Sequence, residues 1–136
     1  MTDDVRIELI SPPTLHKPMG YSHLAKVNAG SLVLIAGQVA LDVSGNIVGK
    51  DDVRAQTERI FENLKAAIES TGGSFRNIIK LNVYMIDISR LADYREVRDR
   101  YVDVRNPPAS TAIQVAALVR PEFLIEVEAI ASDKPS

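Results

Sequence analysis

The chain has 136 residues, of which 46% are hydrophobic and 25% charged, as is typical of one globular domain. Its formal net charge of −2 argues against a general nucleic-acid-binding protein, which needs a basic surface to neutralise phosphates. The absence of cysteine excludes disulfides, and the acidic N-terminus and short apolar runs predict neither a signal peptide nor a membrane span. We therefore expect a cytoplasmic protein, with a core from about residue 5 to residue 131.

The first third of the chain is predicted to contain three strands. The first covers residues 5–10 and ends at a pair of prolines. Residues 24–28 and 32–38 flank a short turn with a glycine, a pattern typical of a hairpin. The second of these strands begins LVLIA, which is apolar on both faces, so we expect it to lie centrally in a sheet.

Two helices separated by a strand are predicted next. Apolar side chains at helical spacing mark residues 53–68 and residues 91–101. Asp51 or Asp52 can cap the first helix. Between the helices, residues 78–86 alternate between apolar and polar, as expected of a half-buried strand.

Two further strands, at residues 112–116 and 124–131, complete the order β-β-β-α-β-α-β-β. This order predicts an α+β fold in which one mixed sheet carries two helices on one face. The chain has no third helix for the other face, so we expect self-association to cover it.

No strong catalytic motif marks an active site. His16 and His23 lie apart in a loop region without another ligand at metal-binding spacing, so no metal site is expected. The glycines form no phosphate-binding pattern, and Ser110 lacks the surroundings of a catalytic nucleophile. On the last strand, Glu126 and Glu128 share a face that is otherwise apolar. They are either solvated or salt-bridged, or they line a pocket in which a carboxylate can hold and polarise a water molecule.

Several segments fall in the order and spacing of a known family. They are GYSH at residues 20–23, AGQ at 36–38, the segment 62–87, PPAS at 107–110 and IEVEAIA at 125–131. From about residue 15 to residue 131, the chain resembles the RidA/YjgF family. The most specific part of the match is the proline-containing segment followed by an apolar strand, a loop and IEVE.

The resemblance implies a chorismate-mutase-like α+β fold, a homotrimer and small-molecule sites in the clefts between subunits. It also implies hydrolysis of reactive 2-imino acids, such as 2-iminobutanoate and 2-iminopropanoate, to 2-oxo acids and ammonia without a cofactor. By motif position, Glu126 corresponds to the glutamate that positions the attacking water. Tyr21, Ala36 and Gly37 correspond to residues that shape the pocket, although Tyr21 could also be an aromatic residue that only packs at an interface.

The family's arginine, which holds the substrate carboxylate, is missing from this sequence. Its position falls on Ser110, and Thr111 takes the place of the small polar residue that follows. A hydrogen bond to a charged group contributes about 1.5–3 kcal/mol, so we expect ordinary 2-imino acids to bind weakly and turn over slowly. Arg95, on the second helix, or Arg120, before the last strand, could replace the charge, or both are solvated surface residues.

Three functions remain open. The first is hydrolysis of an imine or enamine less acidic than an amino-acid imine, with Glu126 holding the water and Ser110 and Thr111 orienting the ligand. The second is a non-catalytic trimer that binds a small metabolite in the same cleft. The third, an endoribonuclease, conflicts with the acidic balance and the absence of a plausible histidine pair. The retained glutamate favours hydrolysis over binding alone, and no nucleic acid or membrane partner is expected.

Overall fold

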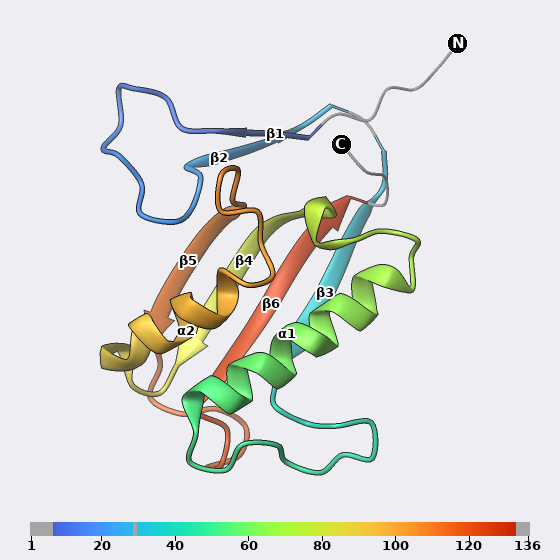
Figure 1. Ribbon diagram of the computed structural model, residues 1–136, viewed down its shortest axis with the longest axis vertical. Coiled ribbons are helices and arrows are strands. Elements are labelled where there is room, and N and C mark those ends of the chain that lie inside the picture. The colour runs from blue at the N-terminus through green and yellow to red at the C-terminus, as the bar shows by residue number, and fades with distance from the viewer. Residues whose placement is uncertain (1–6, 29, 133–136) are drawn as a thin grey trace.

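The computed structural model describes residues 7–28 and 30–132. They form a four-stranded sheet with strand order β3-β6-β4-β5 and a separate two-stranded sheet of β1 and β2 (Figure 1). The strands are β1 (Ile7–Ile10), β2 (Leu24–Val27), β3 (Leu32–Gln38), β4 (Ile78–Met85), β5 (Ala109–Gln114) and β6 (Ile125–Ser132). The helices are α1 (Val53–Glu69) and α2 (Leu91–Arg98), with short 3-10 turns at Phe75–Asn77 and Ile88–Arg90.

The predicted α+β class and the predicted order of strands and helices are confirmed. The larger sheet is mixed, because β5 runs parallel to β4 whereas β6 is antiparallel to both β3 and β4. Both helices lie on one face of this sheet (Figure 1). No helix in the described ranges is both long enough and apolar enough to cross a membrane.

The predicted hairpin and the predicted central position of residues 32–38 are wrong. β2 pairs with β1, whereas β3 pairs with β6 and forms one edge of the larger sheet. The inner face of β3 places Ile35 in the core, and the outer face leaves Leu34 74% exposed. A strand that is apolar on both faces can therefore lie at an edge when its outer face is left open in the single chain. The first two residues of the predicted first strand lie outside the described part of the chain.

The core lies between the larger sheet and α1. Ile60, Phe61 and Leu64 are fully buried on one face of this helix, at the spacing that predicted it. Asp52 caps the helix, and its side chain accepts a hydrogen bond from the backbone N–H of Ala55 at 3.1 Å. α2 is shorter than predicted, because hydrogen-bonded turns replace the helix after Arg98.

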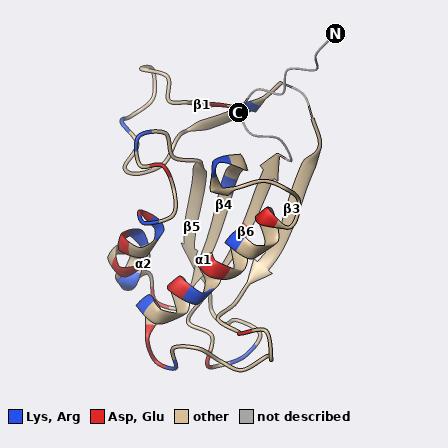
Figure 2. Cartoon of the chain, turned by 45° about the vertical axis from the view of Figure 1, so that its right-hand side comes forward, with Lys and Arg blue, Asp and Glu red and all other residues tan. Residues whose placement is uncertain are grey.

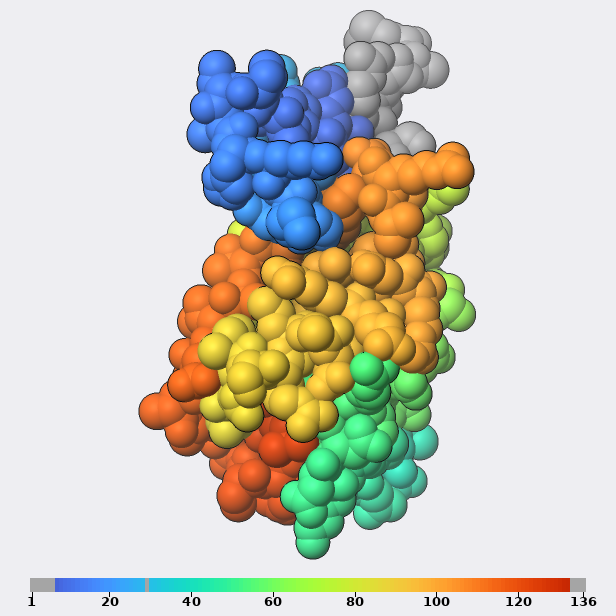
Figure 3. Space-filling model, turned by 60° about the vertical axis from the view of Figure 1, so that its left-hand side comes forward, coloured from blue at the N-terminus to red at the C-terminus, as the bar shows by residue number. Residues whose placement is uncertain are grey.

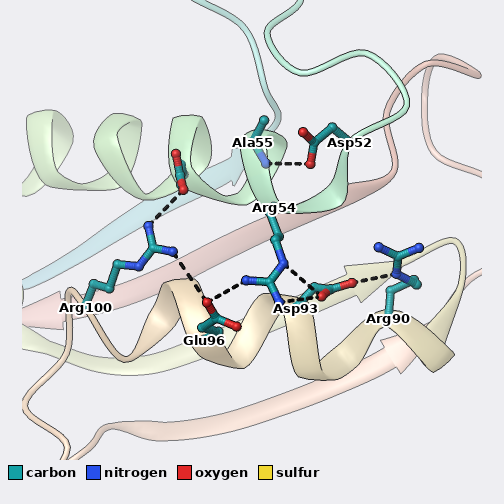
Figure 4. Close-up of polar contacts among 8 residues, drawn as sticks. Asp52, Arg54, Ala55, Arg90, Asp93, Glu96 and Arg100 are labelled. Atoms are coloured by element: carbon teal, nitrogen blue, oxygen red, sulfur yellow. Dashed lines mark hydrogen bonds and ion pairs between the residues drawn. The ribbon is translucent and has the colours of Figure 1, made fainter.

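Ion pairs join the outer surfaces of the two helices (Figure 4). Arg54 of α1 contacts Asp93 at 3.0 Å and Glu96 at 2.6 Å, both on α2. Arg90 also contacts Asp93, and Arg100 contacts Glu58 of α1. Charges of both signs alternate along these helices (Figure 2). Exposed pairs of this kind contribute less than about 1 kcal/mol each, but they show which side of α2 faces α1.

The side chain of Gln56 connects α1 to the beginning of β6. Its amide is fully buried and donates to the carbonyl groups of Gly49 at 3.1 Å and Glu122 at 2.9 Å. Its oxygen accepts a hydrogen bond from the backbone N–H of Leu124 at 2.9 Å. All three contacts are to backbone groups that need a partner when buried.

We predict that Gln56→Leu lowers the free energy of unfolding by at least about 1–3 kcal/mol, because the N–H of Leu124 loses its partner. Urea denaturation followed by circular dichroism measures this change. Lys65→Ala is the control, since Lys65 forms only an exposed pair with Glu69 at 3.5 Å. Equal stability of the two variants would contradict a structural role for the Gln56 amide.

Candidate functional site

A cavity of about 300 Å³ lies between α2, the edge strand β5 and the N-terminal segment. Four residues named from the sequence line it together: Tyr21, Arg95, Ser110 and Thr111. Figure 3 shows the face of the molecule on which these three parts of the chain border one another. The remaining lining residues are Met19, Leu91, Tyr94, Arg98 and Ala112.

Contacts between Ser22 and the segment before β5 hold Tyr21 at this cavity. The backbone N–H of Ser22 donates to the carbonyl of Pro108 at 3.1 Å, and its hydroxyl donates to the carbonyl of Pro107 at 2.6 Å. Ser22 also forms an isolated parallel bridge with Ala109. The segments GYSH and PPAS, far apart in the sequence, are thus joined by direct hydrogen bonds.

The two histidines lie beside Tyr21 and contact one another. Their ring centroids are 4.7 Å apart, a contact that their separation of seven residues in the sequence did not indicate. The Nε2 atom of His16 lies 3.0 Å from the Tyr21 hydroxyl, and the Nε2 atom of His23 lies 2.7 Å from the carbonyl oxygen of His16. Within residues 7–28 and 30–132, no three metal-binding side chains are grouped as a metal site would require.

Of the two arginines proposed to replace the missing one, Arg95 lines the cavity and Arg120 does not. Arg120 instead contacts Glu122 at 3.4 Å, and its guanidinium lies 4.8 Å from the centre of the Phe123 ring. The structure adds Arg98, which the sequence did not single out. Arg98 follows Arg95 by three residues, so helical spacing places both on the same side of α2.

A β-bulge in β3 brings Ala36 and Gly37 next to the glutamates of β6. Ile35 pairs with Ala129 and Gln38 with Val127, so the two bulge residues stand opposite the single residue Glu128. A Cβ atom on Gly37 would lie 2.8 Å from the carboxyl carbon of Glu126 and closer still to Oε2. The close approach of the Glu126 carboxyl therefore requires glycine at this position.

Glu126 and Glu128 differ in their surroundings although they share one face of β6. Glu128 accepts hydrogen bonds from the Tyr84 hydroxyl at 2.5 Å and from Asn82 at 3.2 Å. Glu126 has no hydrogen-bond or ion-pair partner among the residues that the structure describes. Burial raises the pKa of Glu126 above its ordinary value, and the nearby charge of Glu128 raises this pKa further. Neither glutamate therefore forms a salt bridge within the described part of the chain.

The predicted site residues form two groups rather than one. Ser110 pairs with Leu81 of the core, so its side chain is on the helix-covered side of the sheet. Glu126 pairs with Tyr84 and lies on the open side. The bulge and Ser110 are also on opposite edges of the sheet, about 14 Å apart for three strand spacings. One chain therefore carries two half-sites that do not meet.

We predict that Gly37→Ala lowers the free energy of unfolding by about 1 kcal/mol or less, because the Glu126 carboxyl, at the end of a flexible side chain, must move away from the added methyl group. The same substitution in a Glu126→Ala background should cost much less, since the overlapping atoms are gone. Thermal unfolding of the four proteins of this double-mutant cycle measures the coupling. Identical costs in both backgrounds would show that the overlap is absent in solution.

The chain is similar to known proteins in both sequence and fold. Residues 14–133 match the family model described as Endoribonuclease L-PSP. A RutC family protein of Pyrococcus abyssi is 37% identical over 125 residues, which cover 91% of this chain and 95% of that protein. The structure of YyfB from Yersinia pestis, of the Rid protein family, has a TM-score of 0.84 at 32% identity and covers 93% of this chain and 98% of that one. RidA from an Antarctic Psychrobacter has a TM-score of 0.69 at 33% identity and covers 92% and 98%. The chain belongs to the RidA/YjgF family.

Proposed function

We propose that this protein hydrolyses the C=N bond of a small imine, including an imine formed when an enamine tautomerises, in a cleft that two copies of the chain complete. The observation that carries this proposal is the unpartnered Glu126 carboxyl beside the Gly37 bulge. One copy contributes the cavity with Tyr21 and Ser110, and a second copy contributes Gly37 and Glu126. Family membership supports the same reaction, because the resemblance to the RidA/YjgF family implies imine hydrolysis.

The reaction needs one water molecule and one group that moves its protons. The oxygen of the water bonds to the carbon of the C=N bond, while Glu126 accepts a proton from the water and passes it to the nitrogen. The resulting carbinolamine then loses its hydroxyl proton to the nitrogen, the C–N bond breaks, and ammonia and a carbonyl compound are released. A carboxyl whose pKa is raised towards neutrality accepts and returns a proton more readily, as general acid–base catalysis requires.

The open face of the larger sheet supports assembly into the proposed homotrimer. Leu32 is 59% exposed and Leu34 is 74% exposed on the outer side of β3, and Ile113 is 45% exposed on β5. Exposed apolar side chains gathered on a sheet face are typical of a protein–protein contact surface. Contact between the β5 edge of one chain and the open face of the next would bring the cavity of one copy near Glu126 of the other.

Although the matching family model is described as Endoribonuclease L-PSP, the charge of this chain argues against RNA cleavage. RNA binding depends on Lys and Arg that neutralise phosphates, whereas the net charge here is −2. Both Glu126 and Glu128 add negative charge to the open face. The His16 and His23 rings contact one another, but each ring already has a hydrogen-bond partner.

We predict that Glu126→Gln lowers the rate of imine hydrolysis by about 100-fold or more, because the amide cannot move the protons. Imines are generated in place with an amino-acid oxidase, and their loss is followed by competition with semicarbazide. Glu122→Gln is the matched control, since Glu122 pairs with Arg120 away from both half-sites. Unchanged turnover in Glu126→Gln would contradict the role of Glu126. A natural protein that hydrolyses neither acidic nor neutral imines would favour the non-catalytic binding protein.

We predict that Leu34→Lys reduces the assembly to monomers and abolishes imine hydrolysis, because a charged side chain cannot be buried there without a partner. Sedimentation velocity measures the assembly. Val119→Lys is the control, since Val119 is 89% exposed in a loop outside the sheet. A natural protein that sediments as a stable monomer would contradict both the trimer and the shared cleft.

A further inference from the structure

We infer that α2 supplies the anion-binding group of the cavity, with Arg98 as the principal residue and Arg95 as a second cation. The cavity would then take a ligand with an oxyanion group, although Ser110 stands where the family has arginine. This inference rests on the proposed function for the role of the cavity. It replaces the expectation that the ligand is less acidic than an amino-acid imine.

The charge of the cavity lining is the first observation in favour. Arg95 and Arg98 line the cavity, and no carboxylate does. The acidic residues of α2 lie on its other side, where Asp93 and Glu96 contact Arg54 of α1 (Figure 4). Arg95 makes no ion pair within the described ranges. The helix thus directs its acids towards α1 and two cations towards the cavity.

The position of the Arg98 guanidinium is the second observation. Its side chain is only 7% exposed, and Asp99 contacts the Nε and Nη2 atoms at 2.9 Å each. The Nη1 atom has no hydrogen-bond partner among residues 7–28 and 30–132. Asp99 is 47% exposed and lies outside the lining, so it orients the guanidinium without occupying the cavity. An arginine held in this way keeps N–H donors for a planar or tetrahedral oxyanion.

Gly20 and Tyr94 lie beside the Arg98 guanidinium and leave room for it. Gly20 has a φ of +79°, and a Cβ atom there would lie 2.5 Å from Nη2 of Arg98. The Tyr94 ring lies 5.8 Å from the centre of the guanidinium. Tyr94 also lines the cavity, and its hydroxyl is buried without a hydrogen-bond partner in the described part of the chain. These contacts hold a cation at the cavity and leave polar groups unused.

Ser110 is compatible with this arrangement. An arginine at position 110 would add a third guanidinium to a lining that already holds two. Serine avoids this repulsion and still offers a hydroxyl group to an oxyanion. A serine at position 110 is therefore compatible with two cations on α2 that line the same cavity.

Isothermal titration calorimetry with three probes tests the inference: 2-oxobutanoate, inorganic phosphate and the uncharged 2-oxobutanamide. We expect the natural protein to bind at least one anion more tightly than the amide, and the anion that binds identifies a carboxylate or a phosphate site. Arg98→Met and Arg95→Met should each lower the affinity for that anion by about 10- to 100-fold and leave the affinity for the amide unchanged. Arg98→Lys, which keeps the charge but loses the planar fork, should lie between.

Arg100→Met is the matched control, because Arg100 contacts Glu58 of α1 and is absent from the cavity lining. Equal binding of the anions and the amide by the natural protein would overturn the inference, as would an equal loss in Arg100→Met. Circular dichroism checks that each variant is folded. If Arg98→Met does not fold, the loss of anion binding in Arg95→Met tests the inference instead. Anion binding that depends on Arg98 without imine turnover would reject only the proposed function. Turnover of acidic imines that is insensitive to both arginines would reject only the anion site.

Discussion

The hydrogen bonds of the buried Gln56 amide determine where β6 begins, and the rest of the site depends on that point. The amide holds the carbonyl of Glu122 and the N–H of Leu124, immediately before the strand starts. Side chains on a strand alternate between faces, so a shift of one residue would turn Glu126 into the core and expose Val127. A polar residue inside the apolar layer thus keeps the carboxyl on the open side of the sheet.

The alternation of side chains along β6 also places Glu126 away from the cavity. β6 lies inside the sheet and carries Glu126, whereas the cavity lies beyond the edge strand β5 on the helix-covered side. The chain therefore separates the Glu126 carboxyl from the cavity by the thickness and width of one sheet. Under the proposed function, association of copies is part of the active site, because no rearrangement of side chains within one copy would join the two.

Much of this fold was predictable because its signals are local. The alternation along β4 and the helical spacing along α1 correctly gave both elements, and the order of elements correctly indicated the α+β class. Motif positions also identified Tyr21, Arg95 and Ser110, which line one cavity. The likeness of GYSH and PPAS to a known family was sufficient for this, although nothing in their spacing shows that they touch.

The errors arose where long-range contacts decide the outcome. The apolar run LVLIA cannot reveal whether its outer face meets another layer or is left open, so β3 was misplaced as a central strand. The contact between His16 and His23 depends on how a loop folds back on itself. Arg98 was overlooked because a charged helix residue is ordinarily solvated, and its burial depends on Gly20, far away in the sequence.

The bulge at Ala36 and Gly37 also affects what the free edge of β3 can do. An edge strand presents unpaired N–H and C=O groups that another chain can extend into a continuous sheet. The bulge adds one residue to β3, which bends the strand and interrupts the regular spacing of those groups. The feature that brings Gly37 to Glu126 therefore also shortens the stretch along which a neighbouring chain can add a strand. An apolar edge can thus remain available for defined association while being a poor template for fibrous growth.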